Sequence, residues 1–128
     1  MIESSFRFLN YRVTKIEMNI DDNFGKTPDG LKPIINSSFG ISEENPKLAE
    51  IILDININSD SSLFAFFVQV KGVFEANDEM TEDMFIKMCK VNAPAVLLPY
   101  ARSIITNYTA LCNIKPIILP LFNLTKNN

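Results

Sequence analysis

The chain has 128 residues, of which 47% are hydrophobic and 21% charged, and its formal net charge at pH 7 is -3. This length and composition fit a single domain over residues 1–128 and exclude a disordered chain. The weakly acidic balance offers no basic surface for nucleic acid. No apolar run reaches the roughly 18 residues of a membrane-spanning helix, and the first residues do not resemble a signal peptide. We therefore expect a cytoplasmic protein that binds no nucleic acid and does not insert into a membrane.

Four strands are predicted in the first part of the chain, where apolar and polar residues alternate with a period of two. These stretches are residues 6–20, 35–42, 51–58 and 63–75. The alternation slips between Val13 and Ile16, which indicates a β-bulge in the first strand. The fourth strand is apolar on both faces, so it needs cover on both sides or uses an exposed apolar surface for contacts.

One long helix is predicted after Thr81, a suitable N-cap with acidic residues in the following turn. Pro94 and Pro99 lie inside the apolar pattern, and Pro99 should kink the helix. Two apolar stripes follow. One comprises Leu97, Tyr100, Ile104, Tyr108 and Leu111, and the other comprises Leu98, Ala101, Ile105 and Cys112. Because a lone surface helix needs one stripe, we expect one to face the sheet and the other to face a second subunit.

The helix should end near Cys112 and Asn113, and the proline-broken apolar tail from Ile114 to Leu124 should lie extended. The order of elements predicts an α+β fold. We expect a four-stranded antiparallel sheet, arranged as a meander, with one long kinked helix packed on one face.

The sequence contains no template for catalysis. Histidine is absent, and no glycine-rich phosphate loop or nucleophile motif is present. Cys89 and Cys112 form no metal-binding pair and are expected to be reduced thiols in the core. Adjacent acidic residues fall in predicted loops or in a first helical turn, where charges are usually solvated. We expect no enzyme, no cofactor and no metal site.

The stretch N-A-P-A-V-L-L-P-Y-A-R, from Asn92 to Arg102, closely resembles the P-x-[IV]-L-[FL]-P-Y-A-R signature of SecB, the bacterial protein-export chaperone family. Ile105-Thr106 continues this resemblance, and Lys115–Asn123 resembles the proline-containing crossover that follows the signature helix. The resemblance implies a SecB-like sheet and helix, and dimers that pair into tetramers through that helix. It also implies a holdase that binds unfolded preproteins or other non-native polypeptides in hydrophobic grooves and delivers them to the protein-export machinery.

The resemblance and the residue pattern together give candidate sites. The candidates for client binding are Phe24, Phe64, Phe66 and Phe67, although an ordinary core role is an equal alternative for each phenylalanine of the fourth strand. The candidates for the homo-oligomer interface are Leu97, Tyr100, Arg102, Ile104, Ile105, Tyr108 and Leu111. For Tyr100 a structural role is favoured, as an anchor of the helix on the sheet, and for Arg102 a pairing at a subunit contact.

Two alternatives to an export holdase stay open. The first is a SecB-like chaperone of an antitoxin in a toxin–antitoxin system, and the second is a structural or adaptor subunit that binds no client. The family resemblance also implies the secretion ATPase as a partner. Two departures count against that docking: no acidic residue occurs in Val68–Lys71, where the family has a docking position, and the sequence ends at Asn128 without the second helix and acidic tail.

Overall fold

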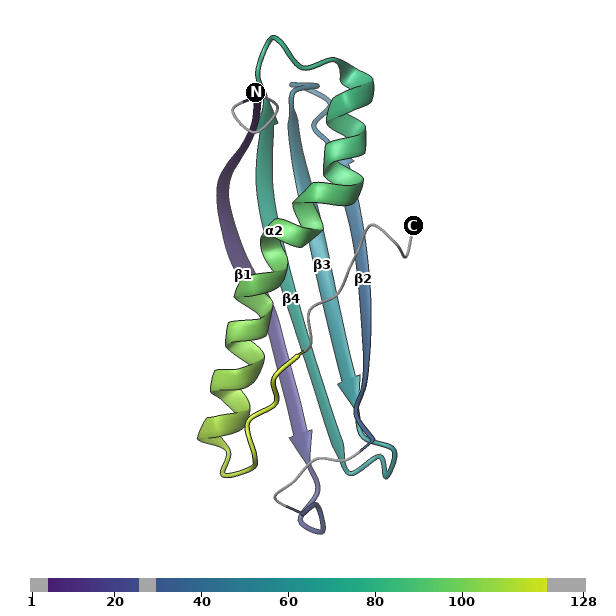
Figure 1. The fold of residues 1–128 in the computed structure, drawn as a ribbon, viewed down its shortest axis with the longest axis vertical. Coiled ribbons are helices and arrows are strands. Elements are labelled where there is room, and N and C mark those ends of the chain that lie inside the picture. The colour runs from purple at the N-terminus through teal and green to yellow at the C-terminus, as the bar shows by residue number, and fades with distance from the viewer. Residues whose placement is uncertain (1–4, 26–29, 120–128) are drawn as a thin grey trace.

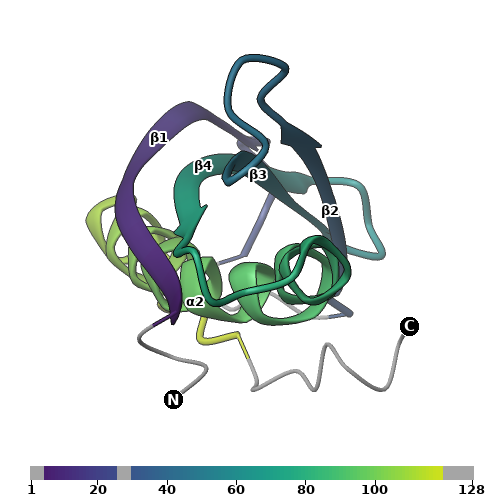
Figure 2. The same ribbon diagram turned by 90° about the horizontal axis from the view of Figure 1, so that it is seen from above.

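Four antiparallel strands and one long helix form two layers in the computed structural model, which describes residues 5–25 and 30–119 (Figure 1). The elements are β1 (Phe6–Ile20), β2 (Lys32–Ile41), β3 (Leu48–Asn58), β4 (Phe64–Ala76) and α2 (Glu82–Leu111). The sheet is strongly curved, and α2 lies on its concave side (Figure 2). The predicted α+β fold, with an antiparallel sheet and one helix on one face, is confirmed.

The order of the strands differs from the predicted meander. The sheet runs β1-β4-β3-β2, with antiparallel pairing throughout, so β1 lies beside β4 and β2 forms the opposite edge. The physical reason lies in the composition of β4. Because β4 is apolar on both faces, it gains from a central place, where side chains of β1 and β3 pack beside its own side chains on each face.

The register of β1 contains the predicted bulge and a second one. Its pairing with β4 shifts between Val13 and Lys15, as expected, and also between Phe8 and Asn10. The second bulge leaves the side chain of Leu9 40% exposed. β1 is therefore an irregular edge strand.

The face of the sheet under α2 carries the core. On β3, Ile51, Leu53, Ile55 and Ile57 have no exposed surface, which confirms the alternation seen in the sequence. On β4, every second residue from Phe64 to Ala76 is buried, and the residues between them are half-buried. The opposite face, which we call the outer face, is therefore only partly covered.

The helix α2 is continuous over 30 residues. Thr81 caps it as predicted, because its Oγ1 accepts a hydrogen bond of 3.2 Å from the backbone N–H of Met84. The helix bends along its length and crosses the sheet from the β2 side to the β1 side (Figures 1 and 2). It contains Pro94 and Pro99, which remove backbone donors from its interior and account for the bend.

A glycine allows α2 to approach the sheet closely. A Cβ atom at Gly72 on β4 would lie 2.7 Å from Cδ2 of Leu97 and 3.0 Å from Cε1 of Phe74. Leu97 and Phe74 are fully buried, so neither side chain has free space to withdraw. A side chain at Gly72 would therefore push the helix away from β4.

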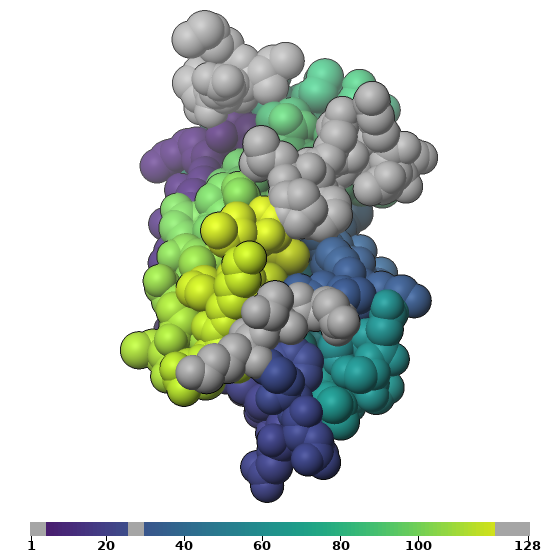
Figure 3. All heavy atoms as spheres, turned by 60° about the horizontal axis from the view of Figure 1, so that its bottom comes forward, coloured from purple at the N-terminus to yellow at the C-terminus, as the bar shows by residue number. Residues whose placement is uncertain are grey.

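The segment after the helix folds back along it, as Figure 3 shows in yellow against light green. The helix ends at Leu111, and Asn113 adopts a left-handed conformation with φ 61°. Two threonines of α2 hold the returning segment. Thr106 Oγ1 donates to the carbonyl of Ile117 at 2.7 Å, and the N–H of Ile117 donates to Thr109 Oγ1 at 2.9 Å. The predicted non-helical tail is confirmed as far as residue 119, and the rest of it lies outside the described residues.

Within residues 5–25 and 30–119, no helical segment combines the length and the hydropathy that a bilayer-spanning helix requires.

Candidate functional site

The four phenylalanines predicted to contact a client do not line one surface. Phe64 and Phe66 are 1% and 2% exposed and lie between the sheet and α2. Phe24 is half-buried and stacks on Phe64 with ring centroids 5.5 Å apart. Phe67 lies on the outer face, where Nζ of Lys15 is 5.6 Å from its ring centroid. Phe64 and Phe66 are therefore core residues, because side chains enclosed so fully cannot reach a client while the domain is folded.

The helix residues predicted for the subunit interface divide into two groups. Leu97 and Ile105 have no exposed surface and pack on the sheet, so they offer nothing to a second subunit. A separate row of half-buried and exposed apolar side chains runs along α2, and we call it the outer helix stripe. It consists of Val96, Tyr100, Ile104, Tyr108 and Leu111, of which Tyr108 is 41% and Leu111 83% exposed.

Tyr100 links the outer helix stripe to β1. Its ring stacks on that of Tyr11, with centroids 4.0 Å apart, and lies 6.0 Å from the ring of Phe8. These contacts place Tyr100 as an anchor of α2 on the sheet, as the sequence favoured. Arg102 is half-buried and borders a pocket of about 320 Å³ between α2 and the returning segment. Its Nε is buried without a hydrogen-bond partner among the described residues.

The two cysteines differ in their surroundings. Both are free thiols, but only Cys89 is buried, and burial raises its pKa to about 11. Cys112 is exposed at the C-cap of α2 and not in the core as predicted, because the last helical residue is Leu111 and Cys112 lies beyond the buried part of the helix. No group of three or more His, Cys, Asp or Glu side chains in the described part of the chain could hold a metal ion.

We expect the two thiols to react at very different rates with a disulfide reagent such as Ellman's reagent. The thiolate is the reactive form, and it is both rare and shielded at Cys89. Near pH 8 one thiol per chain should react quickly, and the second should react only when the chain unfolds. A Cys112→Ser variant should lose the fast phase and keep the slow one. Two fast thiols in the native protein would contradict this placement.

β2 forms an edge of the sheet and has little of the usual protection of edge strands after its first two residues, Lys32 and Pro33. Its residues from Pro33 to Ile41 include no charged side chain. The other edge, β1, carries two bulges and several charged side chains: Arg7, Arg12, Lys15 and Glu17. Charges and bulges on an edge discourage the pairing of further strands, and a flat uncharged edge permits it. β2 is therefore the more open of the two edges.

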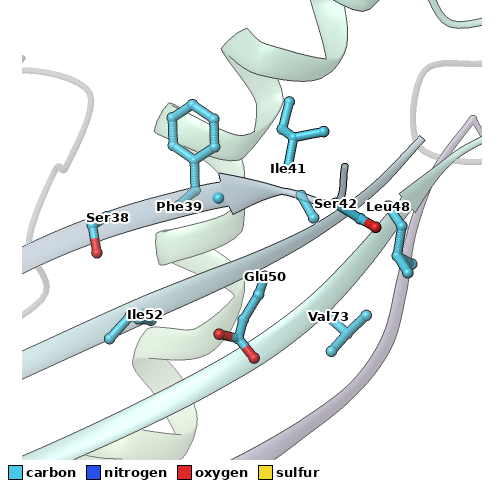
Figure 4. A pocket seen from close by; sticks show the side chains of 10 residues that line it. Ser38, Phe39, Ile41, Ser42, Leu48, Glu50, Ile52 and Val73 are labelled. Carbon is cyan, nitrogen blue, oxygen red and sulfur yellow. The ribbon is translucent and has the colours of Figure 1, made fainter. Parts of the chain in front are cut away.

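Two pockets flank β2 at the same level. The helix-side pocket, of about 460 Å³, lies between β2 and the N-terminal half of α2, and its lining is Ser37, Ser38, Phe39, Cys89, Lys90 and Val91. The outer pocket, of about 570 Å³, lies over the other face, and Figure 4 shows its lining. In that view Phe39 and Ile41 point to one side of β2, and Glu50 and Val73 point to the other.

One position in the lining of the outer pocket, Gly40, has no side chain. A Cβ atom built on Gly40 meets no atom within 4 Å, so the space over the strand is open. Leu48, Ile52 and Val73 provide an apolar floor, and among the described residues of the lining Glu50 carries the charge. The pocket can therefore accept an apolar chain that ends in a positive charge.

Neither pocket was predicted from the sequence. Their residues come from β2, β3, β4 and α2, and their proximity depends on a strand order that was not predicted. Two signals pointed to the region: the uncharged run from Pro33 to Ile41, and Gly40 inside a strand, where glycine often marks a close approach by another chain.

Comparisons with known proteins agree with this architecture. The family described as preprotein translocase subunit SecB matches residues 26–126. The protein-export protein SecB of Anaplasma phagocytophilum is 29% identical over 121 residues, which cover 91% of this chain and 73% of that protein. An uncharacterised protein of Methanocaldococcus jannaschii is 41% identical over 56 residues, which cover 44% of this chain and 36% of the relative.

A solved structure shows the same fold. The SecB-like chaperone of Mycobacterium tuberculosis, in complex with a ChAD peptide from the HigA1 antitoxin, superposes with a TM-score of 0.76. The superposition covers 93% of this chain and 88% of the other, at 10% sequence identity. A family match over most of the sequence, together with the signature helix lying across a four-stranded antiparallel sheet, shows that this chain belongs to the SecB family.

Proposed function

We propose that this protein is a holdase chaperone that binds non-native polypeptides, such as unfolded preproteins, along the β2 edge. The observation that carries the proposal is the pair of pockets on the two faces of an edge strand that has no charged side chain from Pro33 to Ile41. Non-native chains expose apolar side chains, and burying one such side chain contributes roughly 1.5–3 kcal/mol without requiring a particular sequence. Membership of the SecB family supports the same function.

The proposal extends to assembly. We infer a homo-oligomer, a dimer or a tetramer, formed through the outer helix stripe. Tyr108 and Leu111 support this assignment because they expose 41% and 83% of their surface on a helix whose other side is fully packed. Large apolar side chains that follow one another along an exposed helix face usually mark a protein contact.

We also propose that the protein delivers its clients to the export machinery, with the secretion ATPase as a partner. The name of the Anaplasma relative, a protein-export protein, supports this proposal. Gln69 and Lys71 occupy the outer face of β4, where the family resemblance leads us to expect an acidic residue. Docking to the ATPase would therefore need other contacts. We place this activity in the cytoplasm.

An antitoxin is the second candidate client. The supporting observation is the Mycobacterium tuberculosis neighbour, whose structure contains a peptide from an antitoxin. A toxin–antitoxin operon beside the gene, and recovery of its antitoxin with the purified protein, would favour this client over preproteins.

Light scattering tests the proposed function directly. A denatured model protein should aggregate on dilution from denaturant, and a molar excess of this chain should suppress most of the scattering. A non-chaperone protein of similar mass at equal concentration is the control and should have no effect. Unchanged aggregation in the presence of this chain would remove the holdase function and leave a structural or adaptor subunit.

A further inference from the structure

We propose that the pocket between α2 and the returning segment binds the carboxylate of a small organic acid, with Arg102 as its main partner. Side chains of α2 form one wall of this pocket, and Ile118 and Leu119 form the other. Its volume of about 320 Å³ is at the small end of the range for ligand pockets, so it suits a small molecule. The site is separate from the two pockets that flank β2 and goes beyond the proposed chaperone function.

Arg102 is a half-buried cation without a partner in residues 5–25 and 30–119. Its Nε is buried and unbonded, and its terminal nitrogens make no hydrogen bond or ion pair in that part of the chain. Burying an N–H group or a charge costs free energy unless an acceptor is supplied. A carboxylate supplies both an acceptor and a counter-charge, because its two oxygens match the fork of a guanidinium.

The charges around the pocket favour an anion. From residue 84 to residue 119 the sequence contains no aspartate or glutamate, but it contains three lysines besides Arg102. Both walls of the pocket fall within this stretch, so neither wall carries an acidic side chain that would compete for the guanidinium. The local charge is therefore positive, although the net charge of the whole chain is -3. A positive local field attracts anions.

Ser103 and Asn107 supply further donors beside the guanidinium. Asn107 Nδ2 donates to Ser103 Oγ at 3.3 Å. Because Ser103 Oγ accepts this bond, its own hydrogen is left to donate to a ligand, and the second hydrogen of the Asn107 amide is left as well. Both residues line the pocket together with Arg102. A carboxylate bound there can therefore accept hydrogen bonds from three side chains.

The wall opposite α2 is held in place without a ligand. Thr106 Oγ1 donates to the carbonyl of Ile117, and the N–H of Ile117 donates to Thr109 Oγ1. These bonds fix the returning segment beside α2 (Figure 3), and with it Ile118 and Leu119. Binding does not have to order this segment, which lowers the entropic cost for a small ligand.

The rest of the lining is apolar and selects the body of the ligand. Pro99, Ile118 and Leu119 contribute apolar surface, and Ile118 is 74% exposed. A short alkyl chain attached to the carboxylate can cover part of this surface. Phosphate fits less well, because it brings more charge than one guanidinium balances and more oxygens than these donors satisfy. The lining thus favours a short-chain monocarboxylate.

Butanoate is the probe for this site, and NMR of the arginine side chains is the measurement. The chain has three arginines, so its Nε–H groups give few signals, and loss of one signal in Arg102→Lys identifies Arg102. Adding butanoate to the intact protein should shift that signal until it saturates. Butanamide has the same shape without the charge and should bind about tenfold or more weakly, because the charge-assisted bonds are lost.

Ile118→Glu tests the pocket with a carboxylate that the chain itself supplies. The new side chain can pair with Arg102, so it should compete with butanoate and weaken its binding about tenfold or more. Ile118→Gln has nearly the same shape without the charge and should weaken binding much less. Both variants should fold, because Ile118 is largely exposed.

Arg102→Lys tests the geometry of the guanidinium, with binding followed through the backbone N–H signals of Ser103 and Asn107. A lysine keeps the charge but loses the paired donors, so butanoate should bind about tenfold more weakly. Arg12→Lys is the matched control, because Arg12 is exposed on β1 and should not affect the pocket.

Equal shifts with butanoate and butanamide, or no shift with either, would overturn the carboxylate site. Tighter binding of inorganic phosphate, or of acetyl-glutamate-amide as a model of a protein side chain, would overturn a small organic acid as the ligand. A shift of the Arg102 signal on dilution of an oligomer, with no response to butanoate, would assign Arg102 to a contact between copies and overturn the site. The light-scattering assay tests the holdase function separately.

Discussion

Phe74→Ala is expected to lower the free energy of unfolding by about 3–5 kcal/mol, a large loss for a single substitution. Phe74 has no exposed surface and lies at the centre of an aromatic cluster. Its ring stacks on Phe6 and Phe8 of β1, with centroids 5.1 Å and 5.0 Å away. The loss has two parts, the missing transfer free energy of the ring and the cavity that the close-packed sheet and helix leave behind.

Urea unfolding followed by circular dichroism measures this change. Ile118→Ala is the matched control, because that side chain is apolar but 74% exposed, and its loss should change stability by less than about 0.5 kcal/mol. If Phe74→Ala cost no more than Ile118→Ala, the aromatic cluster would not hold β1 against β4 and α2.

Tyr108→Glu is expected to disrupt assembly, and Leu111→Glu should have the same effect. Each variant places a charge in the outer helix stripe, and burying an unpaired carboxylate at a subunit contact costs several kcal/mol. A penalty of about 2.7 kcal/mol or more corresponds to at least a hundredfold weaker association. At micromolar concentration, light scattering should then report the 14.5 kDa monomer.

Ala110→Glu is the control for this pair of variants. Ala110 is exposed on the same turn of α2 but outside the outer helix stripe, so the added charge stays solvated. This variant should elute with the unmodified protein. An unchanged mass for Tyr108→Glu and Leu111→Glu would show that α2 is not the interface, and a monomeric unmodified chain would refute the assembly altogether.

Local patterns predicted the elements well because each pattern is decided within a few residues. The alternation in β3 needs only the period of a strand, and the capping of α2 by Thr81 needs one side chain and the N–H three residues later. The bulge between Val13 and Lys15 in β1 was visible in the sequence as a break in the alternation of apolar and polar residues. These features do not depend on which element becomes a neighbour.

Features that depend on neighbours were predicted less well. In β4, both faces are apolar, and the sequence did not identify Phe64 and Phe66 as the side covered by α2. On the helix, Leu97 belongs to the sheet-facing side, because residues 97 and 98 both point inward where the helix lies close to Gly72. The strand order was mispredicted for the same reason, because the spacing of apolar residues does not show which strand pairs with β1.

The hydroxyls of Thr106 and Thr109 bind the backbone carbonyl and the backbone N–H of the same residue, Ile117. The connection from the helix to this point has a fixed length as a consequence. One extra residue after Asn113 would bring Pro116 to the threonines, and proline has no hydrogen to offer Thr109. Insertions and deletions should therefore be rare at this bend, even though most of its side chains are in contact with solvent.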